Sequence, residues 1–130
     1  MLAAVAAGGA VGAVARWGVA EMSPTSTGFP WTTFAINVFG CFLLAALPAL
    51  AVVRRHRLVA LLLGPGVLGG FTTLSAYAEE GRSLLADGRV AATGAYLLGT
   101  LAACVAAVHA GHLLSSPGAQ REFEEEEGNE

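Results

Sequence analysis

The chain has 130 residues, of which 55% are hydrophobic and only 13% are charged. A soluble domain usually carries about a quarter charged residues, so this composition argues against a soluble enzyme. Six of the ten acidic residues fall in the last nine positions, which leaves a weakly basic body with four acids and seven arginines. The arginines form no stripe with interleaved aromatic residues, so nucleic-acid binding is not expected. We therefore expect an integral membrane protein surrounded by lipid.

Four stretches of the chain are apolar enough to cross a membrane as helices. A spanning helix needs roughly 20 apolar residues because the hydrocarbon layer is ~30 Å thick. The pattern predicts an all-α fold, a four-helix membrane bundle in residues 1–114, followed by an acidic tail in residues 115–130 that we expect to be disordered. The predicted spans are about residues 2–20, 32–53, 58–78 and 90–114.

The arginines outside the spans indicate an orientation. Four spans place both termini and the basic turn at residues 54–57 on one side, and Arg82 and Arg89 on the other. Arginine-rich loops favour the cytoplasm, so the termini are expected inside, by a margin of only about two charges.

The third span has an unusual sequence for a continuous helix. Between Gly64 and Ser75 it contains Pro65, four glycines and two threonines. Proline removes a helical hydrogen bond and each glycine costs about 1 kcal/mol of helix propensity. Irregular backbone at membrane depth is tolerated where it is buried in protein or lines a wet cavity. We expect a broken helix near residues 69–73, with a merely kinked helix as the alternative.

A few polar residues stand out within the apolar spans. Arg16 lies close enough to the end of the first span to reach the interface. Asn37 needs hydrogen-bond partners when buried, and either an interhelical contact or a pore-lining role provides them. Glu79 and Glu80 are interpreted as markers of the membrane interface. The spans contain no nucleophile–base pair and no phosphate loop, so an enzyme is disfavoured.

Three ordered motifs resemble a known family. They are Gly8-Gly9-Ala-Val-Gly12-Ala13-Val-Ala-Arg16-Trp17, Thr33-Phe-Ala-Ile-Asn37-Val-Phe-Gly40-Cys-Phe42 and Gly66-Val-Leu-Gly69-Gly70-Phe71-Thr72-Thr73-Leu74-Ser75. Their order and separation are similar to the first three helices of the small bacterial fluoride channels, called Fluc or CrcB. The resemblance covers about residues 2–114 and leaves out the tail.

This resemblance implies an assembly and a bound cation. Members of the family form antiparallel, dual-topology dimers of four-helix subunits, with two fluoride pores and a structural sodium ion between the subunits. The family's sodium ligands are main-chain carbonyls of the broken third helix. In this chain the matching carbonyls belong to Gly69 and Thr72, which agrees with the oxygen ligands that hard cations prefer.

The resemblance also implies an ion pathway. Asn37 matches an asparagine along the fluoride path, Ser75 matches a polar track, Tyr96 matches a tyrosine of the fourth helix, and Arg16 matches an arginine of the first. The chain departs from the family where two phenylalanines line each pore, because Leu74 and Tyr77 stand there. Tyr77 keeps an electropositive ring edge, whereas Leu74 does not.

The expected function is passive, fluoride-selective conduction across the bacterial inner membrane, which lowers cytoplasmic fluoride. The departure at Leu74 leaves two assemblies open: a homodimer, or an obligate heterodimer with a paralogous subunit in which this chain is the accessory member. A small multidrug-type transporter is the weaker alternative. Such a protein needs a carboxylate in its first span, where this chain has only Arg16.

Overall fold

The protein is a bundle of membrane-length helices. The computed structural model describes residues 1–22, 28–115 and 117–128, and every regular element in these ranges is helical. Four segments are long and apolar enough to cross a membrane: Leu2–Met22, Trp31–Ala49, Arg57–Ala86 and Val90–His112. The predicted all-α class and the prediction of four membrane-spanning helices are therefore confirmed.

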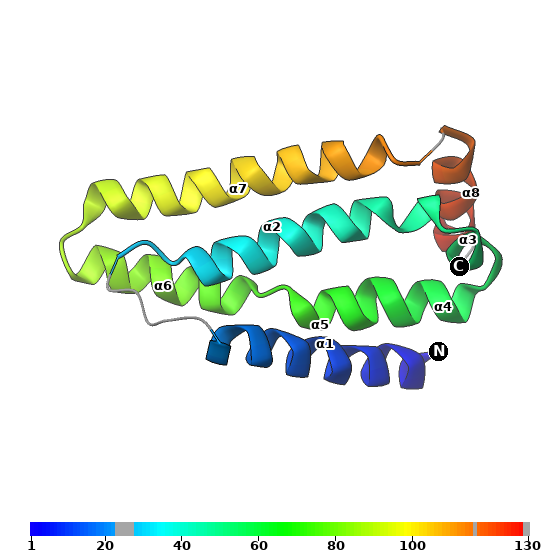
Figure 1. The fold of residues 1–130 in the computed structure, drawn as a ribbon, viewed down its shortest axis with the longest axis horizontal. Helices are drawn as coiled ribbons and strands as arrows, with labels where there is room; N and C mark the ends of the chain where they lie inside the picture. Colours follow the sequence, from blue (N-terminus) through cyan, green and yellow to red (C-terminus); the bar gives the residue numbers. More distant parts are fainter. Residues whose placement is uncertain (23–27, 116, 129–130) are drawn as a thin grey trace.

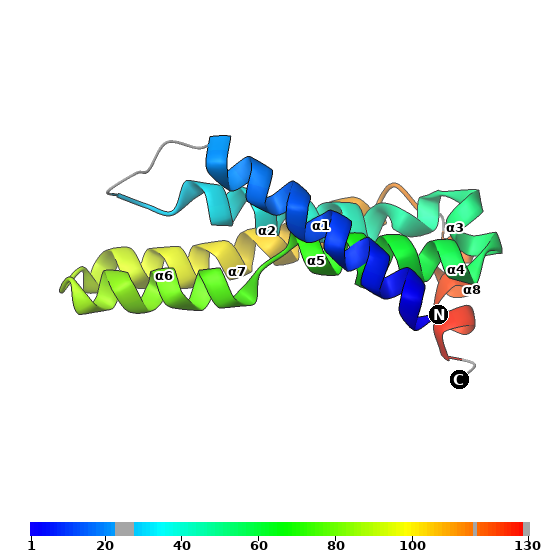
Figure 2. The same cartoon turned by 90° about the horizontal axis from the view of Figure 1, so that it is seen from below.

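The first, second and fourth segments each contain one long helix, and the third is built from several pieces. The long helices are α1 (Leu2–Met22), α2 (Trp31–Ala46) and α7 (Val90–His112). Figure 1 shows α2 between α7 and the third segment, with α1 on the far side of that segment. The N-terminus and the last described helix lie at the end of the bundle where the second segment turns into the third (Figure 1). Viewed from below, α1 crosses the third segment obliquely (Figure 2).

The second segment leaves its helix earlier than the apolar pattern predicts. Pro48 has no amide hydrogen to continue the helical ladder, and the chain forms a short 3₁₀ turn, η1 (Leu47–Ala49), before Leu50 becomes extended. A second short helix, α3 (Ala51–Arg55), follows. The Arg54 guanidinium donates a 2.6 Å hydrogen bond to the Pro48 carbonyl and so helps to hold this turn.

The third segment changes its helical geometry twice. It begins with α4 (Arg57–Leu61) and widens into a π-helical stretch, η2 (Leu62–Leu68), which contains Pro65. Proline cannot donate the usual hydrogen bond, and a wider turn also relieves its clash with the preceding carbonyl. After the single turn α5 (Gly69–Phe71), Thr72 and Thr73 take extended conformations, and α6 (Leu74–Ala86) begins.

Helix α6 continues past the end of the predicted third span at residue 78. The sequence pattern assigns residues 79–89 to a linker, whereas the structure keeps them helical to Ala86. Gly81 and Leu84 are buried on the side of α6 that faces α7, so packing sustains the helix beyond its most apolar stretch. Gly88, with a φ of +72°, then allows the tight turn into α7.

Glycines bring α1 and the third segment into backbone contact. Carbon atoms added at Gly8 and Gly12 would collide with the main chain of η2 and α5, and one added at Gly70 would collide with the carbonyl of Gly9. Small residues are the usual means of close helix packing in membranes, where apolar burial gives little drive for association. Gly8, Gly12 and Gly70 therefore allow α1 and the third segment to pack backbone against backbone.

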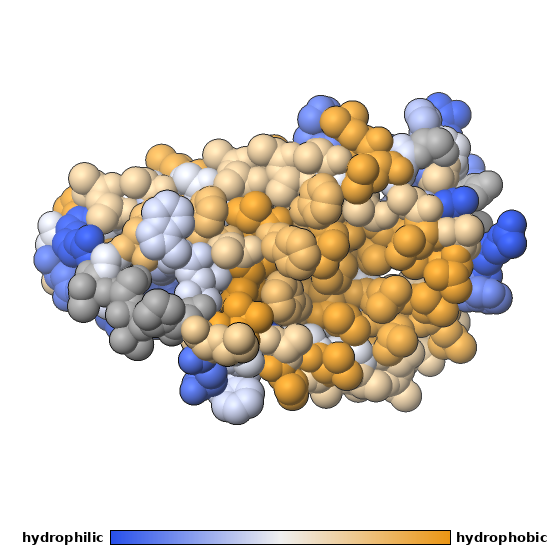
Figure 3. Space-filling model, in the orientation of Figure 1, coloured by the Kyte–Doolittle hydropathy of each residue, from blue (hydrophilic) through white to orange (hydrophobic). Residues whose placement is uncertain are grey.

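The outer surface is largely apolar. Val14, Trp17, Leu98 and Leu101 each expose 60% or more of their surface, and apolar residues cover the middle of the face in Figure 3. Hydrophilic residues gather toward the two ends of this face (Figure 3). This distribution suits a lipid-facing protein with polar ends.

The described part of the acidic tail is largely helical, whereas residues 116, 129 and 130 of the tail lie outside the described residues. Helix α8 (Pro117–Gly128) begins with a proline, which fits the first helical turn because its missing amide hydrogen has no partner there anyway. Ala119 is buried, and α8 lies against η1 and α3. The Gln120 side chain donates to the carbonyls of His112 and Ser115, which couples α8 to the end of α7.

The glycine contact yields a prediction about stability. We expect Gly12→Ala to lower the thermal unfolding midpoint in detergent, because the new methyl group would meet the Val67 carbonyl and lie 2.8 Å from the Phe71 nitrogen. Overpacking of this kind costs about 1–3 kcal/mol. Gly18→Ala on the same helix is the matched control, since nothing lies within 4 Å of the added carbon. Equal midpoints for the two variants would contradict the tight contact.

Candidate functional site

The extended residues between α5 and α6 are held by an asparagine from α2. The Asn37 side chain donates from Nδ2 to the Thr73 carbonyl at 3.1 Å and accepts at Oδ1 from the Thr73 amide at 2.8 Å. Both residues are buried. The Asn37 side-chain amide therefore makes both hydrogen bonds that a neighbouring β-strand would make with the main chain of Thr73. One of the two Nδ2 hydrogens remains after these bonds.

These side-chain contacts release two main-chain carbonyls from helical hydrogen bonding. In a continuous helix the Thr73 amide would donate to the Gly69 carbonyl, but it donates to Asn37 instead. In the same way the Ala76 amide would donate to the Thr72 carbonyl, but it donates to the Thr73 hydroxyl, which caps α6. The carbonyls of Gly69 and Thr72 thereby lose their helical donors.

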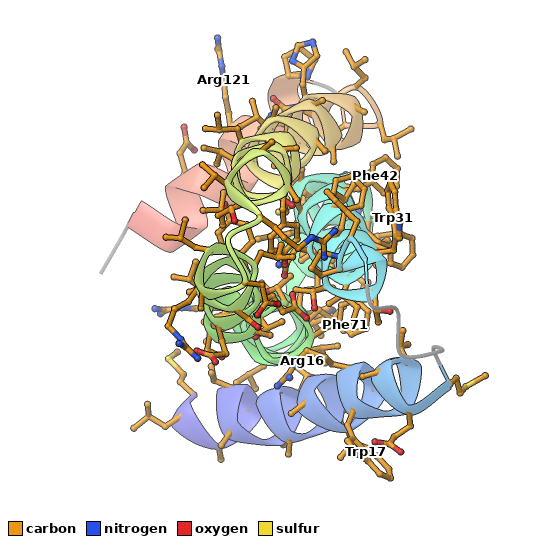
Figure 4. All side chains as sticks on the ribbon, turned by 90° about the vertical axis from the view of Figure 1, so that its left-hand side faces the viewer. Arg16, Trp17, Trp31, Phe42, Phe71 and Arg121 are labelled. Atoms are coloured by element: carbon orange, nitrogen blue, oxygen red, sulfur yellow. The ribbon has the colours of Figure 1, made fainter. Side chains whose placement is uncertain are left out.

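Arg16 reaches this region from α1. Its Nε atom donates to the Gly70 carbonyl at 3.3 Å, and Figure 4 shows its side chain directed toward the third segment near Phe71. The adjacent Trp17 points away from the bundle (Figure 4). Arg16 thus lies half-buried beside the extended residues. The sequence left open whether it reaches the interface, and its contact in the structure is internal.

A second polar cluster lies at the end of the bundle where α6 joins α7. One carboxylate oxygen of Glu80 accepts a 2.7 Å hydrogen bond from the Thr33 hydroxyl, and the other accepts a 2.6 Å bond from the Tyr96 hydroxyl. Tyr96 is fully buried. These bonds join α2, α6 and α7 through a single carboxylate.

The two adjacent glutamates have different environments. Glu79 is exposed and pairs with Arg82 one turn later, which agrees with its interpretation as an interface residue. Glu80 faces inward, and sequence reasoning missed its partners. Helical spacing contains the signal, because residues 77, 80, 81 and 84 share one face of α6, and that face packs on α7.

Tyr77 joins the same cluster through its ring. The Tyr77 and Tyr96 ring centroids lie 5.3 Å apart with the planes tilted by 50°. The Tyr77 hydroxyl donates to the Leu97 carbonyl at 2.7 Å, so this hydroxyl is already engaged within the subunit.

Leu74 and Ser75 lie at the surface of the subunit. Leu74 is 78% exposed, and the Ser75 hydroxyl is 3.2 Å from that of Thr73. The structure therefore brings Asn37, Ser75 and Thr73 together. Most of the surface of Leu74, at the first turn of α6, is therefore not covered by this chain.

Polar residues on α2 and α7 form a facing pair of stripes. On α2 the stripe consists of Thr33, Asn37 and Cys41, and on α7 it consists of Tyr96, Thr100 and Cys104. Residues four apart share a helix face, and α2 packs along α7. Sequence reasoning singled out only Asn37 and Tyr96 from this set. The fourfold spacing of the polar residues on both helices is the signal that would have found the others.

Thr100 is the least satisfied member of these stripes. Its side chain is 3% exposed, and its hydroxyl has no hydrogen-bond partner among the described residues. A buried hydroxyl without a partner loses hydration free energy. Thr100 on α7 and the remaining Nδ2 hydrogen of Asn37 on α2 are thus two buried donors that are not used by the described residues.

Comparison with known proteins assigns the chain to a family. Residues 3–112 match the family model described as "CrcB-like protein, Camphor Resistance (CrcB)". The "Fluoride-specific ion channel FluC 1" of Streptomyces coelicolor is 47% identical over 111 residues, which cover 83% of this chain and 72% of that protein. The "Fluoride-specific ion channel FluC" of Agrobacterium fabrum is 40% identical over 114 residues, which cover 85% and 91% of the two chains. The chain therefore belongs to the CrcB-like family of membrane proteins.

Proposed function

We propose that this chain is a subunit of a fluoride-selective channel that lets fluoride leave the cell passively. The observation that carries the proposal is the similarity to proteins named fluoride-specific ion channels over more than four fifths of the chain. The four membrane-length helices support the same function. The bacterial inner membrane is the proposed location, with the termini and the basic turn at residues 54–57 on the cytoplasmic side.

Buried hydrogen-bond donors on α2 and α7 would replace the water around fluoride. A small anion gives up its hydration only where preformed donors compensate for the loss. The second amide hydrogen of Asn37 and the hydroxyl of Thr100 are such donors at membrane depth. The tilted rings of Tyr77 and Tyr96 add electropositive edges near the Glu80 cluster. The Glu80 carboxylate already accepts bonds from Thr33 and Tyr96, which moderates its negative charge.

The interruption between α5 and α6 serves as the broken third helix and holds a structural sodium ion in a dimer. The carbonyls of Gly69 and Thr72 have lost their helical donors, so they fit a hard cation that prefers oxygen ligands. When bound, sodium would supply positive charge to carbonyls of two antiparallel subunits and so hold them together. Gly69 is an exposed residue of the single subunit, so a partner subunit could approach it.

Leu74 favours the alternative assembly, in which this chain forms a heterodimer with a paralogous subunit. It is 78% exposed at the start of α6, one helical turn from Tyr77. A leucine offers no electropositive edge to an anion, unlike an aromatic ring. A partner subunit with an aromatic residue at this place would supply what this chain lacks.

Fluoride efflux from liposomes tests the pathway. We expect Asn37→Ala to reduce the efflux rate by about tenfold or more, because a hydrogen bond to a charged group contributes about 1.5–3 kcal/mol. We expect Tyr77→Ile to reduce it as well, whereas Tyr77→Phe keeps the ring edge and most of the flux. A fluoride electrode measures the release, and elution from a sizing column shows whether each variant still assembles. Wild-type efflux from Asn37→Ala would contradict the pathway.

Exchange of cations tests the sodium site. We expect the unfolding midpoint to fall when sodium is replaced by a large organic cation, because the Gly69 and Thr72 carbonyls then have no partner. The Asn37→Ala variant is the matched comparison: it frees the Thr73 amide to return to the Gly69 carbonyl, so its midpoint should depend less on sodium. Equal midpoints of the wild type in both buffers would argue against the site.

A gain of function tests the role of Leu74. In liposomes that contain this chain alone, we expect Leu74→Phe to raise fluoride efflux, because the added ring provides an electropositive edge at an exposed position. Leu74→Ile is the control for a change of shape without a ring. If the wild type alone already conducts as fast as Leu74→Phe, the chain needs no aromatic partner.

A further inference from the structure

Aromatic rings gather at the end of the bundle that holds the Glu80 cluster. Phe29 lies just before α2, and its ring centroid is 4.4 Å from that of Trp31 and 5.9 Å from that of Phe34. The same ring meets that of Tyr96 on α7, at 5.3 Å with an interplanar angle of 89°. Edge-to-face pairs of this kind are a preferred geometry of aromatic side chains. Phe29 therefore connects the aromatic residues of α2 to the Glu80 cluster.

The main chain around Phe29 is tied to two helices. Its carbonyl accepts a 2.8 Å hydrogen bond from the amide of Trp31, the first residue of α2. The neighbouring Gly28 carbonyl accepts a 3.4 Å hydrogen bond from Arg89, the residue that precedes α7. These bonds hold the backbone that carries the Phe29 ring, so the ring is supported at its base as well as by its neighbours.

Tyr96 needs lateral support because its hydroxyl lies far from its own backbone. The residue is fully buried, and the hydroxyl donates to the Glu80 carboxylate at 2.6 Å. A functional group must be held within about 0.5 Å of its productive position, and a small tilt of a tyrosine ring moves the hydroxyl by more than that. Tyr77 on α6 and Phe29 both contact the Tyr96 ring, each with its centroid at 5.3 Å.

A place in the aromatic belt of the membrane interface does not account for Phe29. Trp31 is 62% exposed and fits such a belt, whereas Phe29 is half-buried and its ring contacts a fully buried one. Loss of the Phe29 ring would leave space beside Tyr96 and let water approach the Glu80 carboxylate. Water competes for the acceptor and so weakens a hydrogen bond between protein groups.

We propose that Phe29 is a positioning residue of the proposed ion pathway, whose ring keeps the Tyr96 hydroxyl on the Glu80 carboxylate. The positioning stands on the ring and hydrogen-bond geometry, whereas its effect on conduction rests on the proposed channel function. Without the Tyr96 donor, Glu80 would keep its bond from Thr33 but would carry more of its negative charge unneutralised. Fluoride would then be repelled more strongly, since charges interact with little screening away from water.

The Raman spectrum of tyrosine tests the positioning directly. The chain has two tyrosines, so in Tyr77→Phe protein the intensity ratio of the tyrosine doublet reports the hydrogen bonding of the Tyr96 hydroxyl alone. We expect Phe29→Leu to shift this ratio away from that of a strong donor. Phe39→Leu, which removes a 54% exposed ring elsewhere on α2, is the matched control and should leave the ratio unchanged. An unchanged ratio in Phe29→Leu would overturn the proposal.

Fluoride efflux from liposomes tests the consequence for conduction. We expect Phe29→Leu to lower the efflux rate about tenfold, the factor that one hydrogen bond to a charged group is worth, and Phe29→Tyr, which keeps a ring, to retain most of it. In Tyr96→Phe protein, which lacks the hydroxyl, Phe29→Leu should cost little more, because changes that act through one contact are not additive. Additive losses would refute an action through the Tyr96 hydroxyl.

The two measurements separate the positioning from the channel function. If the wild type releases no fluoride, alone or with a paralogous subunit, the channel function fails, while the Raman ratio still decides whether Phe29 positions Tyr96. A shifted ratio with undiminished efflux would refute the role of Phe29 in conduction. If Phe29→Leu does not assemble on a sizing column, Phe29→Met, which fills more of the space without a ring, takes its place in both measurements.

Discussion

The pairing of the Asn37 amide with the main chain of Thr73 is the constraint on which the rest of the site depends. It replaces a helical hydrogen bond at membrane depth, where an unpartnered amide or carbonyl is costly, with two bonds from another helix. The exchange keeps Thr72 and Thr73 extended and leaves the carbonyls of Gly69 and Thr72 available. The Thr73 hydroxyl then caps α6, so that the second half of the segment starts as an ordinary helix. One side chain thus links the proposed ion pathway to the proposed cation site.

Close approach of the backbones makes this arrangement sterically possible. Gly40 faces Thr72 from α2, and a carbon added at Gly40 would collide with the threonine methyl group. Gly12 and Gly70 bring α1 against the other side of the third segment. The extended residues are therefore held between two helices whose contact surfaces are nearly free of side chains. Arg16 closes the same region by donating to the carbonyl of Gly70.

Polar groups inside the bundle are satisfied in pairs, with few left over. Glu80 uses both oxygens, and Tyr77 and Tyr96 use their hydroxyls. Buried groups paired in this way hold the helices in register and do not require water. Among the described residues, the hydroxyls of Thr100 and Ser115 have no partner, and Asn37 keeps one unused amide hydrogen. If the proposed pathway uses these donors, their small number suits an ion that must bind weakly enough to leave again.

The membrane class, the four apolar segments and the irregular third segment could be predicted from the sequence, because hydropathy, proline and glycine act locally. The helix ends were less accurate: α6 continues to Ala86 because it packs on α7, and the acidic tail forms α8 because Ala119 and Gln120 contact the rest of the chain. Which groups meet depends on how the helices pack. The contacts of Glu80 with Thr33 and Tyr96 and of Asn37 with Thr73 join different helices. A periodic pattern indicates the face on which such a residue lies, but the partner across the interface depends on how the helices pack.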